Sequence, residues 1–210
     1  MIYLHQGTAP SSPMSQNYHC ECGAAISQQI NLELHVSYTY LAMAHHFACK
    51  DVALKNFADY FMQQSYMQRQ HVETLLQLQN QNGGCIQFRD ITKPEEDHWG
   101  SLLSAMGHHL HLQQSIHLSL QDLHWTAGEL GVMQLCDFLE SQCLNPQSRE
   151  IEALGVHASN VHNLRGRENR LTEYRFDTCH WDDGNQEKCP GDKRVSESQV
   201  PSKHAASTVS

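Results

Sequence analysis

The segment from Leu54 to Leu78 constrains the fold most, because one set of its residues recurs at every third or fourth position. The set is Leu54, Phe57, Phe61, Gln64, Gln68, His71, Leu75 and Leu78. This spacing predicts one face of a long amphipathic helix that packs against a partner. The middle of the face is polar, and a buried polar group costs about 1–3 kcal/mol unless it is paired.

Two interpretations of this polar middle stay open. It is either a polar core layer that fixes the register of the helices, or a metal site inside a four-helix bundle. The second interpretation rests on the spacing of His71, which follows Gln68 by three positions as in carboxylate-x-x-His motifs.

Three further stretches repeat the pattern, and each carries a polar residue in the middle of its apolar stripe. The stretches lie near residues 22–49, 101–129 and 133–164, and the polar residues are Glu33, Gln113 and Gln147. A carboxylate on a core stripe is rarely buried without a partner. Tyr40, two turns after Glu33, is placed to join the same polar layer. Four matched interruptions favour the metal interpretation over a chance polar residue.

The connections predict a bundle with one long crossover. Asp51 is expected to cap the second helix, and Gly83 with Gly84 is expected to end it. Residues 85–100 have no helical period, and Pro94 interrupts them. Extended, such a stretch spans up to roughly 55 Å, against about 40 Å for a helix of about 27 residues. The stretch can therefore run the length of the bundle. Pro146 is expected to kink the fourth helix.

Length and composition place the chain in a broad class. Its 210 residues suit one domain with tails. We expect a flexible lead over residues 1–16, a helical domain over 17–180 with a short amphipathic piece near 171–180, and a disordered tail over 181–210. The formal net charge of −9 argues against a nucleic-acid partner.

The same composition argues against a membrane or secreted protein. No apolar run approaches the roughly 18 residues of a membrane span, and the first ten residues lack the hydrophobic segment of a signal peptide. The chain is therefore expected to be cytoplasmic, with its eight cysteines as reduced thiols. The chain has sixteen histidines, and His108, His109 and His111 form a cluster. Most of the histidines are expected on exposed or half-buried helix faces.

Several short runs carry a resemblance to a known family. The runs are QNYH, INLEL, DVALKNFA, LQNQ followed by GG, LCDFLE, and LTEY followed by FD, and they span Gln16 to Asp177. Over this range the chain resembles the ferritins of the animal heavy-chain type, and the resemblance needs no gap. The resemblance implies an all-α fold, namely a ferritin-like four-helix bundle with one long crossover and a short fifth helix. It also implies assembly, with itself or with other heavy or light ferritin subunits, into a hollow shell that stores iron.

The resemblance further implies a di-iron ferroxidase centre inside the bundle. By position, its residues are Glu33, Tyr40, Gln68, His71, Gln113 and Gln147, and Glu73 is what remains of a mineral-nucleating patch. The family has glutamates where this chain has Gln68 and Gln113. Hard iron cations prefer anionic oxygen ligands, so we expect weakly held iron and little or no oxidation of ferrous iron.

Two alternatives to this hypothesis stay open. In one, the chain is an active ferroxidase subunit, in which Glu33 and His71 still support oxidation. In the other, it is a bundle that does not assemble and has no storage function. Whether the chain is an enzyme is therefore undecided from the sequence.

The resemblance also implies two kinds of channel through a shell. Pores at the three-fold axes would be lined by His124, Cys136, Asp137 and Glu140, and their carboxylates would concentrate cations. At the four-fold axes, the family places leucine at the position of Arg175. Four guanidinium groups at about 8 Å would repel by ~2 kcal/mol per pair at an effective dielectric near 20. A mixed shell is therefore expected to form more readily than a pure one.

Overall fold

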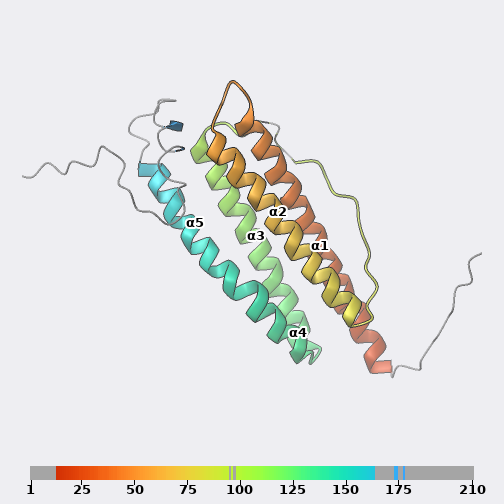
Figure 1. Ribbon diagram of the computed structural model, residues 1–210. Coiled ribbons are helices and arrows are strands. Elements are labelled where there is room, and N and C mark those ends of the chain that lie inside the picture. The colour runs from red at the N-terminus through yellow and green to blue at the C-terminus, as the bar shows by residue number, and fades with distance from the viewer. Residues whose placement is uncertain (1–12, 95, 97, 164–172, 175–176, 178–210) are drawn as a thin grey trace, which may run out of the picture.

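The computed structural model in Figure 1 describes residues 13–94, 96, 98–163, 173, 174 and 177. Within that part the chain is all-helical. It contains α1 (Pro13–Ala48), α2 (Lys55–Gln81), α3 (Leu102–Glu129) and a fourth rod made of α4 (Met133–Phe138), the π-helical segment η1 (Leu139–Leu144) and α5 (Asn145–Asn163). Helix α1 packs against α2 and α3, and α3 packs against α5. This arrangement confirms the predicted four-helix bundle.

One end of α2 agrees with the prediction, and the other end is capped in a different way. The helix ends at Gln81, just before the predicted stop at Gly83, whose φ of 68° favours glycine. Its start is different, because Leu54 occupies the capping position and makes no side-chain cap. The expected cap by Asp51 is therefore wrong.

The missing cap is supplied from the far end of the chain. The backbone N–H groups of Asn56 and Phe57 donate to the carboxylate of Asp177, at 3.3 and 2.9 Å. Because the first N–H groups of a helix have no partner within it, a carboxylate placed there satisfies them. Glu173 accepts in the same way from the N–H of Leu102 at the start of α3.

Of the predicted short helix at 171–180, the structure describes Glu173, Tyr174 and Asp177, and all three are helical. Arg175 lies outside the described residues, as do residues 1–12 and the predicted tail at 181–210. Helix α1 begins at Pro13, earlier than the expected start near Cys22. A proline fits the first turn of a helix because its missing N–H would have no partner there.

The segment between α2 and α3 forms the long crossover, which runs beside α1 in Figure 1. Side chains on successive turns of α1 hold it. Ser27 Oγ accepts from the N–H of Gln87 at 3.3 Å, Asn31 donates to the carbonyl of Asp90 at 3.3 Å, and His35 Nδ1 contacts the carbonyl of Thr92 at 3.1 Å. The four-residue spacing along α1 places these three side chains on one face. The predicted crossover is confirmed.

The fourth rod changes its winding just before Pro146. Residues Leu139–Leu144 form a π-helical segment, and the N–H of Asn145 donates to the carbonyl of Glu140, five residues back. Proline has no N–H to donate, and such a wider turn is one way in which a helix accommodates it. The expected distortion at Pro146 therefore takes the form of six π-helical residues that lead into α5.

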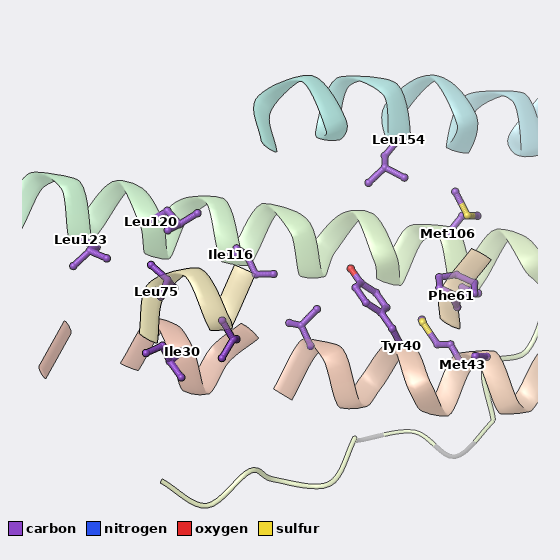
Figure 2. Packing of buried hydrophobic residues seen from close by; sticks show 14 of the residues in the cluster. Ile30, Tyr40, Met43, Phe61, Leu75, Met106, Ile116, Leu120, Leu123 and Leu154 are labelled. Carbon is purple, nitrogen blue, oxygen red and sulfur yellow. The ribbon is translucent and has the colours of Figure 1, made fainter. Parts of the chain in front are cut away.

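The core between the helices has an aromatic end and a polar middle. Phe47, Phe57 and Phe61 are fully buried, and the rings of Phe47 and Phe61 stack with centroids 5.7 Å apart. Figure 2 shows Phe61 close to Tyr40, whose hydroxyl points from α1 toward α3. Burial of each large apolar side chain contributes about 1.5–3 kcal/mol.

Among the described residues, no helix has the length and apolar character needed to cross a membrane.

Candidate metal centre

Glu33 on α1 is the carboxylate of the polar layer. It is almost completely buried, with 2% of its surface exposed. Its Oε1 accepts from Nε2 of Gln29, one turn earlier, at 2.8 Å. Its Oε2 has no hydrogen-bond partner in the described structure. Burial raises the pKa of Glu33 to about 7, and the hydrogen bond from Gln29 opposes that shift. Near neutral pH, this carboxyl group is therefore only partly ionised.

Helix α2 contributes two amides to the interior. Gln64 and Gln68 are both buried, as the stripe predicts, and the side-chain oxygen of each has no hydrogen-bond partner in the described structure. The same holds for Oε1 of Gln29 and of Gln147. Each such buried acceptor costs about 1–3 kcal/mol. The interior therefore holds a set of oxygen atoms that would accept a cation or a proton donor.

Gln113 on α3 differs, because both ends of its amide are engaged. Its Nε2 donates to the hydroxyl of Tyr40 at 3.0 Å, and its Oε1 accepts from Nε2 of Gln147 at 3.2 Å. Gln113 and Tyr40 are fully buried, and Gln147 is 6% exposed. Three members of the predicted site, Tyr40 on α1, Gln113 on α3 and Gln147 on α5, are thus linked by direct hydrogen bonds. Of the two amides, that of Gln113 has both ends engaged, whereas Oε1 of Gln147 has no partner in the described structure.

His71 and Glu73 on α2 lie outside this buried cluster. The side chains of both are exposed, although partial desolvation lowers the pKa of His71. The sequence stripe placed His71 with Gln68 on the core face, and the structure corrects that placement. The reason is geometric, since positions three apart on a helix differ by about 60° and only one of them faces the partner directly.

His109 is the central residue that the sequence analysis missed. It is fully buried, with its Nδ1 2.7 Å from the hydroxyl of Tyr40 and its Nε2 2.9 Å from the hydroxyl of Tyr60. Burial lowers the pKa of His109 to about 3, so the ring is neutral. Most of the described histidines are exposed or half-buried, as expected, and His109 is the buried exception. A signal was available, because His109 precedes Gln113 by four positions and so shares its face.

Cys143, in the π-helical segment, is a half-buried thiol beside Glu33. Burial, together with the negative charge of Glu33, raises the pKa of Cys143 to about 12. A protonated thiol is a poor metal ligand, because the thiolate is the ligating form. No group of three or more His, Cys, Asp or Glu side chains able to hold a metal ion occurs in the part that the structure describes.

The residues of the predicted pore lie together at the other end of α3. Nε2 of His124 is 2.8 Å from Oε1 of Glu140, and the thiol of Cys136 contacts the carbonyl of His124 at 3.7 Å. Burial, followed by the charges of Glu140 and Asp137, raises the pKa of Cys136. Asp137 and Glu140 are exposed. Three of the four predicted residues, His124, Cys136 and Glu140, are therefore linked by direct contacts, and of these Cys136 is buried.

Comparison with protein families gives one match that covers most of the chain. Residues 23–163 match the model of the ferritin-like domain. The matched range contains most of α1, all of the other three helical rods, the buried polar layer and the contacting residues His124, Cys136 and Glu140. Ferritins store iron, and the match supports that role for this protein. The chain belongs to the ferritin family.

Proposed function

We propose that this chain is an iron-storage ferritin subunit of the animal heavy-chain type whose ferroxidase centre has little or no activity. The observation that carries the proposal is the engaged amide of Gln113. Its Oε1 is held by Gln147 and its Nε2 by Tyr40, at 3.2 and 3.0 Å. A ligand already paired with its neighbours must lose those bonds before it can bind a cation.

Charge supports the same conclusion. Two ferrous ions bring four positive charges, and Glu33 is the one carboxylate among the buried members of the polar layer. Its pKa of about 7 means that even this charge is only partly present at neutral pH. Hard cations bind anionic oxygen far better than amide oxygen in a site of low polarity. A pair of irons would therefore be poorly compensated.

A single cation fits the residues better. Oε2 of Glu33 and Oε1 of Gln68 are buried acceptors without hydrogen-bond partners in the described part of the chain. We expect them to hold one iron ion weakly, as substrate on its way to storage, while the Gln113 and Gln147 half of the site stays closed. Binding would displace the proton of Glu33, so affinity should rise with pH through about 7.

Iron would enter the shell through pores lined by His124, Cys136, Asp137 and Glu140. Glu140, which contacts His124, and Asp137 are exposed carboxylates. Three copies of these residues around a three-fold axis would raise the local concentration of cations. This part of the proposal requires a shell, made by this chain alone or with other heavy or light ferritin subunits, in the cytoplasm.

The test measures assembly and iron retention together. The chain is expressed alone and with a normal heavy-chain ferritin, and each product is sized by native mass and then loaded with ferrous iron in air. Arg175→Leu is compared with the parent at equal protein concentration and moderate salt, because removal of four converging guanidinium groups should favour a pure shell.

We expect large particles that retain iron, with the mixed shell or the Arg175→Leu shell more abundant than the parent's own. A particle of monomer or dimer mass in every preparation would overturn the storage proposal and favour the bundle that does not assemble. Equal amounts of large particle from parent and variant would show that Arg175 is no barrier to assembly.

A further inference from the structure

The C-terminal end of α1 brings a histidine ring against a second histidine, which belongs to the crossover. The rings of His46 on α1 and of His98 have centroids 6.1 Å apart and an interplanar angle of 64°. His46 is half-buried, and His98 is exposed. We term these two side chains the His46–His98 pair. Neither residue belongs to the polar layer around Glu33.

The pair continues the row of contacts by which α1 holds the crossover. The three side chains of α1 that bond to the crossover recur every four residues, and the last of them is His35. His46 follows His35 by eleven residues, which is three helical turns to within about 20°. His46 therefore lies on the face of α1 that carries the crossover. Trp99, which is 2% exposed, anchors the chain directly after His98.

One ring nitrogen of His46 has an unused capacity to bind a ligand. Its Nε2 is buried and has no hydrogen-bond partner in the described structure, and a buried polar atom in that position destabilises the fold. Burial, followed by the charge of His98, lowers the pKa of His46, so the ring is neutral near pH 7. A neutral imidazole has one nitrogen with a free lone pair, and this is the form that binds metal ions.

The spacing of the two rings suits one shared metal ion. A zinc–nitrogen bond is about 2.0–2.1 Å long, so two imidazoles on one zinc ion have ring centroids about 4.5–6.3 Å apart, according to the angle between the bonds. The observed separation of 6.1 Å lies within this range. Tetrahedral geometry needs about 5 Å, and the exposed ring of His98 can move closer by a change of rotamer without disturbing the core.

The chemistry of the two ligands selects the kind of cation. Imidazole nitrogen suits borderline cations such as Zn²⁺, whereas hard cations prefer anionic oxygen. Among the described residues, no third His, Cys, Asp or Glu joins the pair to form a larger metal-binding group. Water would therefore fill the remaining positions of a tetrahedral zinc ion. Such a site exchanges its metal more readily than a site with four protein ligands.

We propose that the His46–His98 pair is a zinc-binding site, which clamps the end of the crossover to α1. The zinc ion would be held by one nitrogen of each ring and by two water molecules. Both ligands come from one chain, so the site requires neither a shell nor iron bound at Glu33.

The experiment labels the histidines of the metal-free full chain with diethyl pyrocarbonate, with and without Zn²⁺, and reads each site by mass spectrometry. The reagent attacks the free nitrogen of a neutral imidazole, so a bound zinc ion blocks it. With zinc at about ten times its dissociation constant, labelling of His98 should slow by about tenfold. The exposed residues His45 and His111 are internal controls that should keep their rates. Mg²⁺ in place of Zn²⁺ should leave the labelling of His98 unchanged.

The informative substitution is His46→Gln, which keeps a polar side chain but removes the imidazole nitrogen. A zinc ion held by both rings would lose one of its two protein ligands, so zinc affinity should fall by at least about tenfold. His98 should then lose its protection at the zinc concentration used for the parent. His45→Gln, at the exposed neighbouring position, is the matched control and should keep the protection of His98.

Two results would overturn the proposal. One is labelling of His98 in the parent that zinc does not slow, which would make the contact between the rings merely structural. The other is equal protection of His98 in folded His46→Gln, which would mean that His98 binds zinc without His46. If His46→Gln does not fold, as judged by circular dichroism, calorimetric titration of His98→Gln with zinc under reducing conditions decides. One zinc ion fewer than in the parent supports the proposal, and an equal number overturns it.

Discussion

Nε2 of Gln147 donates to Oε1 of Gln113 at 3.2 Å, so two amides on facing helices are joined by a hydrogen bond in the interior of the bundle. The bond closes the α3–α5 side of the polar layer, where Gln113 also donates to Tyr40. On the α1–α2 side, Glu33 and Gln68 keep acceptors without partners in the described structure. The amide of Gln113 is thus fully engaged, whereas Oε1 of Gln147 joins the acceptors of Glu33 and Gln68 that have no partner in the described structure.

Gln113→Glu should destabilise the metal-free protein, because it replaces a hydrogen-bonded amide with a buried acid. The variant also loses the N–H group that donates to the hydroxyl of Tyr40. We expect a loss of about 1–3 kcal/mol in the free energy of unfolding, measured with urea. The loss should grow between pH 5 and pH 8, since the unfolded acid ionises and the buried acid resists ionisation. Gln114→Glu, which adds the same group at the exposed neighbouring position, is the control. Equal losses in the two variants would mean that position 113 is not a closed polar core.

The pH dependence of stability should contain the signature of Glu33. Its pKa is about 7 in the folded protein and near 4.5 when exposed. Between these values the folded state holds a proton that the unfolded state has released, so stability falls as pH rises from about 4.5 to about 7 and is then constant. The full effect is about 3 kcal/mol. Glu33→Gln cannot titrate, and its stability should exceed that of the parent increasingly over this range. Parallel pH profiles of the parent and Glu33→Gln would show that the carboxyl group is not desolvated.

Asp177→Ala should cost about 1–2 kcal/mol, because it removes the carboxylate that caps α2 through the N–H groups of Asn56 and Phe57. The loss should appear in urea unfolding and as faster hydrogen exchange in the first turn of α2. Glu152→Ala removes an exposed carboxylate on α5 and should change stability little. If both variants match the parent, the C-terminal contact does not support the bundle.

The fold was predictable because its signals are periodic and local. The stripe from Leu54 to Leu78 gives the helix, Gly83 gives its end, and the polar interruptions at Glu33 and Gln113 are buried as expected. The cap from Asp177 was not predictable, since it joins positions 120 residues apart and depends on the assembled fold.

Glu33, Gln68, Gln113 and Gln147 were predictable as buried polar residues, but their hydrogen bonds were not. The stripes indicate which residues face inward, but they do not tell whether Gln113 points its oxygen at a metal or at Gln147. His109 and Tyr60 were missed for a related reason. Each lies one position from a residue of the apolar stripe, and a rotation of about 100° per residue leaves such positions ambiguous until the neighbouring helix is placed.

The central claim is that this centre oxidises ferrous iron poorly because carboxylates are lacking at positions 68 and 113. Stopped-flow oxidation of ferrous iron tests it most directly, with the parent, Gln68→Glu, Gln113→Glu, the double variant, and a control pair of Gln63→Glu with Gln114→Glu at exposed positions of the same helices. The account predicts that the parent and the control pair oxidise iron little faster than buffer, and that the double variant gains a measurable rate. Rapid oxidation by the parent would contradict the account.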